Sequence, residues 1–391
     1  MDEIINQLRP DNTLALKIFE EIKDIYKLDL RLYGSVAKGT NIKNEYDLDI
    51  FYHTEETKEH AFNKLLDITK ANNIPYTIKY SEHPYIRISY KGINADLVPI
   101  SSKYKTSVDR TPKHFEYIIT HLKPEQKDQV RLLKYFLKIL GLYGADIKVR
   151  GFSGYLCELL IIKYENFLNL IKNVSEWKRP IIIDLENNKE KDFEEDFVVV
   201  DPTDGKRNVA AAVSLENLSK FILYSRNFLK NDYKNFFYPK PFDQTGEYGI
   251  VLHHNIEIED KLYGRLRRLS NIFVNNLEIK HIYTKKVRIY SKDNIAYIGI
   301  FPINNKIKMK IVKEGPNIES YKKIDKEIFL KNDKIYIVEQ MNEDIDNFVK
   351  NFFSKLDRIG FNEFQLIKHG YDLEHFKNER SMDNWRDSLL F

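Results

Sequence analysis

The feature that most constrains this chain is a glycine–serine turn that is soon followed by two aspartates two positions apart. The turn is Gly34-Ser35, and the aspartates are Asp47 and Asp49. Apolar alternation over residues 29–33 and again over 46–52 predicts a strand on each side. Gly34 lets the backbone turn tightly because it has no Cβ, and Ser35 can cap a helix whose amide groups face an anion. The stretch therefore predicts a strand–turn–helix–strand unit that holds a phosphate.

The aspartates predict a metal site at this turn. Residues two apart on a strand leave the same face, so Asp47 and Asp49 would stand about 7 Å apart along the backbone. Asp96 is the only carboxylate in the apolar strand expected at residues 93–100, where a buried acid would be costly without a cation or a partner. We therefore expect Asp47, Asp49 and Asp96 to form the carboxylate set of a two-metal, Mg²⁺-dependent transfer.

Each signal alone has an ordinary alternative. A glycine–serine pair is a common helix cap, an Asp-x-Asp strand is often a solvated face, and Asp96 could face water from an edge strand. Their order along the chain is more specific: it resembles the signature of the DNA polymerase β-type nucleotidyltransferase superfamily. A helix over 55–72 and strands over 75–80, 85–90 and 93–100 favour a mixed sheet with helices on one side.

The composition fits a globular protein of several domains. With 391 residues, 42% of them hydrophobic and 31% charged, the chain can hold two or three domains. The single cysteine, Cys157, excludes an internal disulfide and a cysteine-based zinc site, and its apolar, helical setting indicates packing. We expect no secretory signal, no membrane span and a cytoplasmic location, because no basic start precedes an apolar run and no run approaches about 20 residues.

Basic residues gather late in the chain. The net charge is +4, yet residues 280–323 alone carry eleven Lys or Arg against three Asp or Glu, which suggests a polyanionic partner. Strand-like segments place Lys306, Lys308 and Lys310 on one face, and Lys286 and Arg288 repeat the pattern. Three such lysines make a row about 14 Å long, enough to follow backbone phosphates. The alternative is a solubilising outer face of a sheet.

Two further positions are candidates for phosphate contact. Thr111-Pro112 opens a helix, with Thr as the cap and Pro in the first turn, which places His114 near the positive end of the helix dipole. Lys134 lies with Arg131 and Lys138 on the basic side of a helix over 124–140. Such a histidine is usually a surface residue, and such a stripe is usually solvated. Opposite a metal site, either could hold a triphosphate.

Longer strings resemble a narrower family, the archaeal-type (class I) CCA-adding enzymes, which are tRNA nucleotidyltransferases. The match covers roughly residues 30 to 230 and rests on Gly34-Ser35 with Asp47-Leu48-Asp49, on Asp109 to His114, on Val130 to Lys134, on Tyr143 to Leu160, and on Asp201-Pro202 with Arg207 to Ala211. Beyond this range, the chain resembles the family only in general character. The class II CCA-adding enzymes have a different architecture outside the catalytic head, and these strings do not belong to it.

The resemblance implies template-independent addition of C, C and A to the tRNA 3′ end from CTP and ATP. It implies metal ligands at Asp47, Asp49 and Asp96, triphosphate contacts at Ser35, Lys38, His114, Lys134 and Tyr143, and a base-reading arginine at Arg207. Gly34 and Thr111 belong to the same expected nucleotide site. In the family the first carboxylate is often Glu, and the basic residue after the turn is often Arg. Asp47 is one methylene shorter, and Lys38 cannot bind phosphate bidentately.

The expected architecture is α+β: a polymerase-β-like head with a mixed sheet over 1–130, a largely helical nucleotide-recognition domain over 131–255, and an α/β tRNA-binding body and tail over 256–391. The segment Tyr238-Pro239-Lys240-Pro241 is the best linker candidate, because paired prolines oppose helix and sheet. The tail would hold the tRNA acceptor stem and elbow by shape and backbone. A homodimer is implied by the resemblance alone.

Two other hypotheses stay open at this stage. The chain could be a different nucleotidyltransferase of the superfamily, such as a poly(A) or uridylyl polymerase, against which the string Arg150 to Leu160 argues. It could also be a catalytically inactive RNA-binding module, which the intact acids Asp47, Asp49 and Asp96 disfavour.

Overall fold

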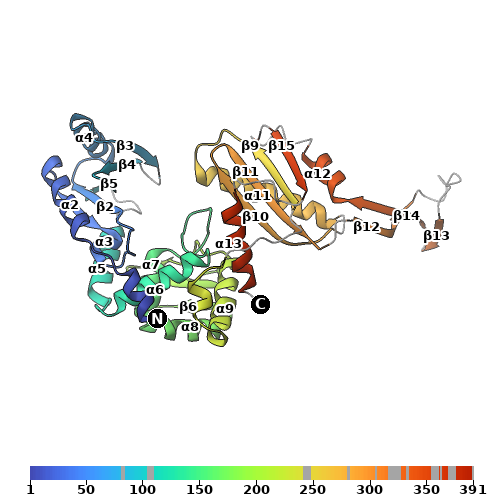
Figure 1. The fold of residues 1–391 in the computed structure, drawn as a ribbon, viewed down its shortest axis with the longest axis horizontal. Helices are drawn as coiled ribbons and strands as arrows, with labels where there is room; N and C mark the ends of the chain where they lie inside the picture. Colours follow the sequence, from blue (N-terminus) through green and yellow to red (C-terminus); the bar gives the residue numbers. More distant parts are fainter. Residues whose placement is uncertain are drawn as a thin grey trace. The chain divides into compact units, whose positions relative to one another are not determined.

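In the computed structural model, the glycine–serine turn directly follows the first strand of a five-stranded sheet, and Asp49 lies in the second strand (Figure 1). The strand order is β1-β2-β5-β4-β3, in which β2 and β5 are parallel and the other neighbours are antiparallel. The predicted mixed sheet is therefore confirmed. Its elements and the flanking helices are α1 (Asp2–Leu8), α2 (Thr13–Tyr26), β1 (Leu30–Tyr33), α3 (Gly34–Lys38), β2 (Leu48–Thr54), α4 (Lys58–Ala71), β3 (Tyr76–Tyr80), β4 (Pro84–Tyr90) and β5 (Ile93–Ser101).

One face of this sheet carries the core, and the other carries the charged residues. Side chains alternate between the two faces along β2. Leu48 and Ile50 pack in one buried cluster with the apolar faces of α2 and α4, so Asp49 between them points to the opposite face. The same alternation holds in β4 and β5, where the residues flanking Arg87 and Asp96 are buried in that cluster. The sheet thus presents Asp49, Arg87 and Asp96 together on the face that α2 and α4 do not cover.

A helical region follows the sheet. It consists of α5 (Thr111–His121), α6 (Gln126–Ile139), α7 (Gly154–Tyr164), α8 (Phe167–Ser175), α9 (Leu215–Lys230) and α10 (Lys234–Phe237), with a small sheet of β6 (Ile181–Ile183), β7 (Phe197–Asp201) and β8 (Asp204–Asn208). Strand β7 pairs in parallel with β6 and antiparallel with β8. Phenylalanine side chains from α6, α8, α9 and α10 pack edge to face around Phe136 and Phe228.

Three local predictions differ from the structure. Ser35 does not cap α3, because the N-cap residue is Tyr33 and no side chain caps the helix. The cap of α5 is Arg110 rather than Thr111, again without a side-chain bond. The apolar run that starts at Ser153 predicts one long helix through Leu170, but the structure has two helices there, because Glu165 adopts a left-handed φ of 71° and Asn166 caps a new helix through its side chain.

The chain divides into two units, Met1–Pro239 with Leu389–Phe391 and Lys240–Ser388. The division falls inside the segment that the sequence predicts as a linker. The second unit contains β9 (Tyr248–His253), α11 (Glu259–Ile279), β10 (Thr284–Lys292), β11 (Ile295–Pro302), β12 (Lys306–Glu314), β13 (Glu327–Lys331), β14 (Lys334–Asp344), α12 (Ile345–Phe353), β15 (Glu363–Lys368) and α13 (Lys377–Ser388).

Two sheets form the body of the second unit. One has the order β10-β11-β9-β15 and the other β12-β14-β13. Its core packs α11 and α12 against β9 and β11 through Leu266, Phe273, Ile298 and Val349. The α/β character expected of the tail is present.

The structure describes residues 1–80, 84–103, 110–240, 248–279, 282–303, 306–315, 327–331, 334–353, 361, 363–368 and 376–389. Within this part of the chain, no helix combines the length and the apolarity that crossing a bilayer requires.

Candidate active site

Gly34 and Asp49 pack directly against each other. Strand pairing places Asp49 opposite Tyr33, the residue before the turn. Gly34 has a φ of 70°, and a Cβ at this position would lie 1.7 Å from Asp49 Oδ2. Any side chain would therefore displace the carboxylate as well as strain the backbone. The turn glycine is required because the aspartate occupies the space where its side chain would be.

Asp96 lies next to Asp49 and is held by an arginine. Parallel pairing sets Asp49 beside Asp96, and antiparallel pairing sets Arg87 on its other side. Arg87 donates from Nε to Asp96 Oδ1 at 2.6 Å and from Nη2 to Oδ2 at 2.7 Å. Burial, reinforced by the charge of Asp96, raises the pKa of Asp49 to about 6, and the charge of Lys38 opposes this rise. Asp47 is exposed and directly precedes β2 rather than lying within it.

The chemistry of these acids fits a divalent cation. Asp49 and Asp96 are oxygen ligands of like charge on neighbouring strands, and their repulsion is the kind that a hard cation relieves. Within the described ranges, however, no group of three acidic, histidine or cysteine side chains is already arranged as a metal-ion cage. Asp96 would have to share its oxygens with Arg87 or release that arginine to act as a ligand.

Lys38 and Lys134 meet at a buried carboxylate, Glu158 of α7. Lys38 Nζ lies 2.5 Å from Glu158 Oε2, and Lys134 Nζ lies 3.6 Å from Oε1. Thr40 Oγ1 donates to Oε1 at 2.6 Å, and Lys134 also donates to the Thr40 carbonyl at 3.1 Å. Burial would raise the pKa of Glu158, but the two lysines outweigh it and keep the pKa below its usual range. The structure thus brings together two residues that the resemblance assigns to the triphosphate.

The basic side of α6 faces the protein rather than solvent. Arg131 and Lys134 are both buried, and Arg131 donates to the carbonyls of Gly39 and Asn41. The usual reading of such a stripe as a solvated face is therefore wrong for these two positions. Lys138 lies over the Tyr143 ring, 4.9 Å from its centroid. The Tyr143 hydroxyl and the Lys134 ammonium both lie beside Gly154 at the start of α7.

His114 and Arg207 meet at a second buried carboxylate, Asp201. His114 Nε2 lies 2.8 Å from Asp201 Oδ2, and Arg207 Nη1 donates to the same oxygen at 2.8 Å. The His114 ring also stacks on Tyr155, with 4.1 Å between the centroids. Burial opposes the charge on Asp201, but the bonds from His114, Thr203 and Arg207 outweigh it and hold the pKa well below its usual range.

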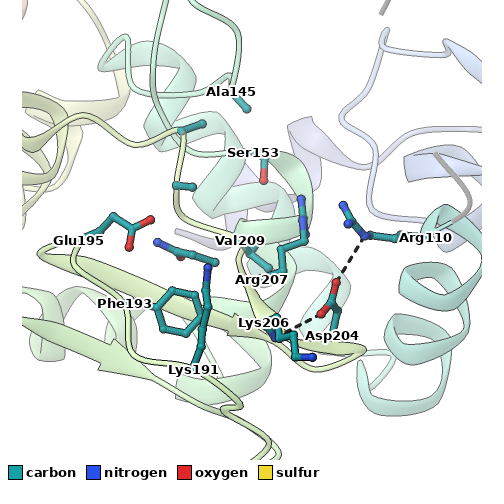
Figure 2. Close-up of a pocket in the computed structure, with 13 residues that line it drawn as sticks. Arg110, Ala145, Ser153, Lys191, Phe193, Glu195, Asp204, Lys206, Arg207 and Val209 are labelled. Atoms are coloured by element: carbon teal, nitrogen blue, oxygen red, sulfur yellow. Dashed lines mark hydrogen bonds and ion pairs between the residues drawn. The ribbon is translucent and has the colours of Figure 1, made fainter. Parts of the chain in front are cut away.

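Arg207 also lines a pocket of about 580 Å³. Figure 2 shows Arg207 between Ser153 and Arg110, with Phe193 and Glu195 on the other side of the arginine. Arg110 forms an ion pair of 3.6 Å with Asp204, which is also drawn there. The remaining lining is Ala145, Lys191, Lys206, Asn208, Val209, Ala211 and Ala212. A pocket of this size with several cations and one aromatic wall suits a nucleotide.

Comparison with known proteins identifies the family. Residues 15–120 match the model of the nucleotidyltransferase domain, and residues 128–238 match the second domain of tRNA nucleotidyltransferase. The chain is 34% identical over 356 residues to the CCA-adding enzyme of Saccharolobus islandicus, covering 86% of each chain. It is also 34% identical over 383 residues to that of Methanocaldococcus jannaschii, covering 86% of this chain and 84% of the other. The chain belongs to the archaeal CCA-adding enzyme family.

Solved structures support the fold of this family member. The Cid1 poly(U) polymerase bound to Mg and 3′-dATP matches 60% of this chain and 96% of its own, with a TM-score of 0.50 and 13% sequence identity. At that identity the likeness concerns the fold alone, and it confirms the expected polymerase-β-like head. The resemblance to archaeal-type CCA-adding enzymes, which rests on the turn, the acids and the longer strings, is also confirmed.

The basic residues predicted in the tail have protein partners where the structure describes them. Lys286 and Arg288 both bind Asp387 of α13, Arg288 at 2.8 Å, and both lie over the Phe301 ring. Arg288 is only 6% exposed, so its guanidinium mainly joins α13 to β10. Lys306, Lys308 and Lys310 lie in β12, but their side chains lie outside the described residues.

Three residues of the site were missed by sequence reasoning. Asp201 and Glu158 fall inside strings that carry the family resemblance, but the resemblance assigns neither of them a role, and the sequence predicts Arg87 only as part of a strand. Glu158 offered a usable signal, because it is the only carboxylate in an otherwise apolar helical run. Asp96 is predicted on the same ground, as the only carboxylate in an apolar strand.

Proposed function

We propose that this protein adds C, C and A to the 3′ end of tRNA from CTP and ATP, without a nucleic-acid template and with release of pyrophosphate. The observation that carries the proposal is its 34% identity, over 86% of the chain, to CCA-adding enzymes. The presence of Asp47, Asp49 and Asp96, with Asp49 and Asp96 on adjacent strands, supports an active rather than an inactive member.

Asp47, Asp49 and Asp96 would hold divalent cations, for which we propose Mg²⁺. Such ions, when bound, favour deprotonation of an attacking hydroxyl and neutralise charge on a triphosphate. The protein itself fixes Asp49 against Gly34 and pairs Asp96 with Arg87. It thereby keeps two of the acids in place on one rigid sheet before any substrate binds.

The cationic residues would bind the nucleotide. Lys38, Lys134 and His114 would neutralise the triphosphate, with Ser35, Thr111 and Tyr143 around it. Arg207 has five N–H donors and a rigid planar fork, and it reaches the pocket described above, so we propose that it reads acceptor atoms on C and A. The replacement of the family's frequent Glu and Arg by Asp47 and Lys38 changes reach and phosphate geometry rather than the type of chemistry.

The acceptor stem and elbow of tRNA would bind along the second unit through backbone charge and shape. The division into a head over 1–130, a central domain over 131–255 and a body and tail over 256–391 stays part of the proposal. A homodimer, which the resemblance alone implies, and a cytoplasmic location also stay part of the proposal.

The deciding measurement is transfer of labelled CTP and ATP to tRNA that lacks its 3′ CCA end. We expect two C residues and then one A. Addition of neither nucleotide, or of long runs of a single nucleotide, would contradict the proposal, the second result favouring a poly(A) or uridylyl polymerase.

Asp49→Asn is the matched test of the acids. It preserves the size of the side chain but removes the charge that would bind the cation, so transfer should fall by at least about 10³-fold while tRNA binding stays within about twofold. A parallel loss of tRNA binding would show that Asp49 has a structural role instead.

A further inference from the structure

Asp201 joins two elements that carry different parts of the predicted nucleotide site. Its carboxylate is fully buried at the end of β7. Oδ2 accepts from His114 of α5 and from Arg207 of β8, each at 2.8 Å. Oδ1 accepts from the Thr203 amide and hydroxyl, each at 2.9 Å, and from the Tyr155 hydroxyl of α7 at 3.4 Å. Both oxygens are therefore saturated by donors from four segments.

The turn between β7 and β8 fixes this carboxylate. Asp201 pairs with Asp204 across the turn, and the two bonds from Thr203 set its side-chain rotamer. The Asn188 side chain also donates to the carbonyls of Asp201 and Pro202. Asp201 is thus a rigid acceptor onto which the longer, more flexible cationic side chains dock.

The arginine that docks there remains able to bind a ligand. Asp201 takes Nη1, and the Arg207 side chain is still 34% exposed toward the pocket. An unrestrained arginine loses much rotamer freedom when it binds. Because the buried carboxylate already holds Nη1 of the guanidinium, the remaining N–H donors can bind a base with little further loss of conformational entropy.

We propose that Asp201 is a positioning residue that couples base selection by Arg207 to triphosphate binding by His114. The inference rests on the proposed function, because it takes the ligand of His114 and Arg207 to be a nucleoside triphosphate. Because His114 and Arg207 dock on the same fixed oxygen, the carboxylate holds the two side chains in one geometry, and a base that does not fit Arg207 leaves its triphosphate poorly placed for His114.

Asp201→Asn tests the coupling. The Asn oxygen can keep the Thr203 bonds, which leaves an NH₂ group facing His114 and Arg207 and releases the arginine. We expect KM for CTP and ATP to rise at least tenfold, kcat to change less, and discrimination against UTP and GTP to fall at least tenfold. Asp196→Asn is the control: it lies just before β7, pairs only with the exposed Arg179 among the described contacts, and should leave both parameters within twofold.

A double-mutant cycle with Arg207→Lys separates positioning from folding. If Asp201 acts through Arg207, the double variant should discriminate no worse than Arg207→Lys alone. Additive losses would overturn the inference. If Asp201→Asn does not fold, Thr203→Val decides, because it keeps the buried charge but removes one bond that fixes it. We expect a two- to fivefold loss of discrimination, and unchanged discrimination would overturn the inference.

These outcomes are distinct from failure of the proposed function. If the unaltered protein adds neither C nor A to tRNA, the proposed function fails and this inference fails with it. If the unaltered protein adds CCA and Asp201→Asn keeps its KM and its discrimination, only the coupling fails.

Discussion

At the scale of single residues, the site depends on contacts that leave no spare volume. Gly34 and Asp49 share a space that admits only one of their side chains, since a Cβ on Gly34 would lie 1.7 Å from Asp49 Oδ2. Gly34 therefore has two roles: it adopts the left-handed backbone conformation at the start of α3, and it leaves room for the Asp49 carboxylate.

Gly34→Ala should therefore reduce nucleotide transfer far more than stability. The left-handed backbone costs an alanine about 1 kcal/mol, and displacing Asp49 should lower kcat at least about 100-fold. Gly92→Ala is the control, because Gly92 has a φ of 82° but no atom within 4 Å of its added Cβ. Thermal unfolding and single-turnover transfer would be compared for both. Equal activity losses would mean that backbone strain, not the clash with Asp49, is responsible.

Much of this residue-scale site could be predicted, and the reason for the remainder is physical. The turn and the acids are visible because a glycine, a period-two carboxylate pair and a lone acid in an apolar strand are local signals. Arg87 with Asp96 could not be predicted, since the pairing depends on the register of β4 against β5. Asp201 and its partners His114 and Arg207 come from three elements, and only the folded chain brings them together.

At the scale of elements, α7 joins the sheet region to the helical region through its buried glutamate. Glu158 binds Lys38 at the end of α3, Thr40 in the following loop and Lys134 of α6. The apolar run of α7 predicts a helix that starts at Ser153, and this start is confirmed: Ser153 is the N-cap and accepts a bond from the Leu156 amide. Its end at Glu165 was not readable, because no proline or glycine marks it.

Glu158→Gln should destabilise this junction. Gln keeps the shape and can still accept from Thr40, but the buried Lys134 loses its counter-charge, and breaking a buried pair in this way costs about 3–5 kcal/mol. Urea unfolding would measure the loss. Asp192→Asn, which removes an exposed pair with Lys189, should change the free energy of unfolding by less than about 1 kcal/mol. A Glu158→Gln effect as small as this control would show that the lysines have other sufficient partners.

Cys157, next to Glu158, provides an independent probe of α7. Burial raises the pKa of its thiol to about 12, above the unfolded value of about 8.5. The native thiol therefore stays protonated as the pH rises from 7 to 9, whereas the unfolded thiol ionises through that range. A thiol reagent should label the unfolded protein increasingly fast over this interval and leave the native protein almost unlabelled. Rapid native labelling at pH 8 would contradict the burial of α7.

Labelling of Cys157 also connects to the junction. In Glu158→Gln we expect faster native labelling at pH 8, because a weaker junction opens α7 more often. The single cysteine of the chain makes the signal unambiguous.

At the scale of the whole molecule, chemistry and charge are distributed over different parts of the sequence. The carboxylates and the pocket proposed to bind the nucleotide lie in the first unit, while the basic segment 280–323 lies in the second. The sequence indicated this separation through its uneven charge and its proline-rich linker. It could not show that Lys286 and Arg288 bind Asp387, because α13 is remote in sequence from β10.

The basic face of β12 should then contribute to tRNA affinity rather than to chemistry. Lys306, Lys308 and Lys310 alternate along a strand paired with β14, so replacing all three with Gln should raise KM for tRNA and leave KM for CTP unchanged. Because each neutralised phosphate contributes about 0.7–0.9 to the slope of log affinity against log salt, the slope should become shallower by roughly 2 to 3. Binding of tRNA would be titrated between 50 and 200 mM salt.

Lys313→Gln with Lys334→Gln is the control, because these lysines form ion pairs with Glu339 and Glu314 on the same sheet. If the triple variant and the control show the same slope, the face of β12 does not bind the RNA backbone.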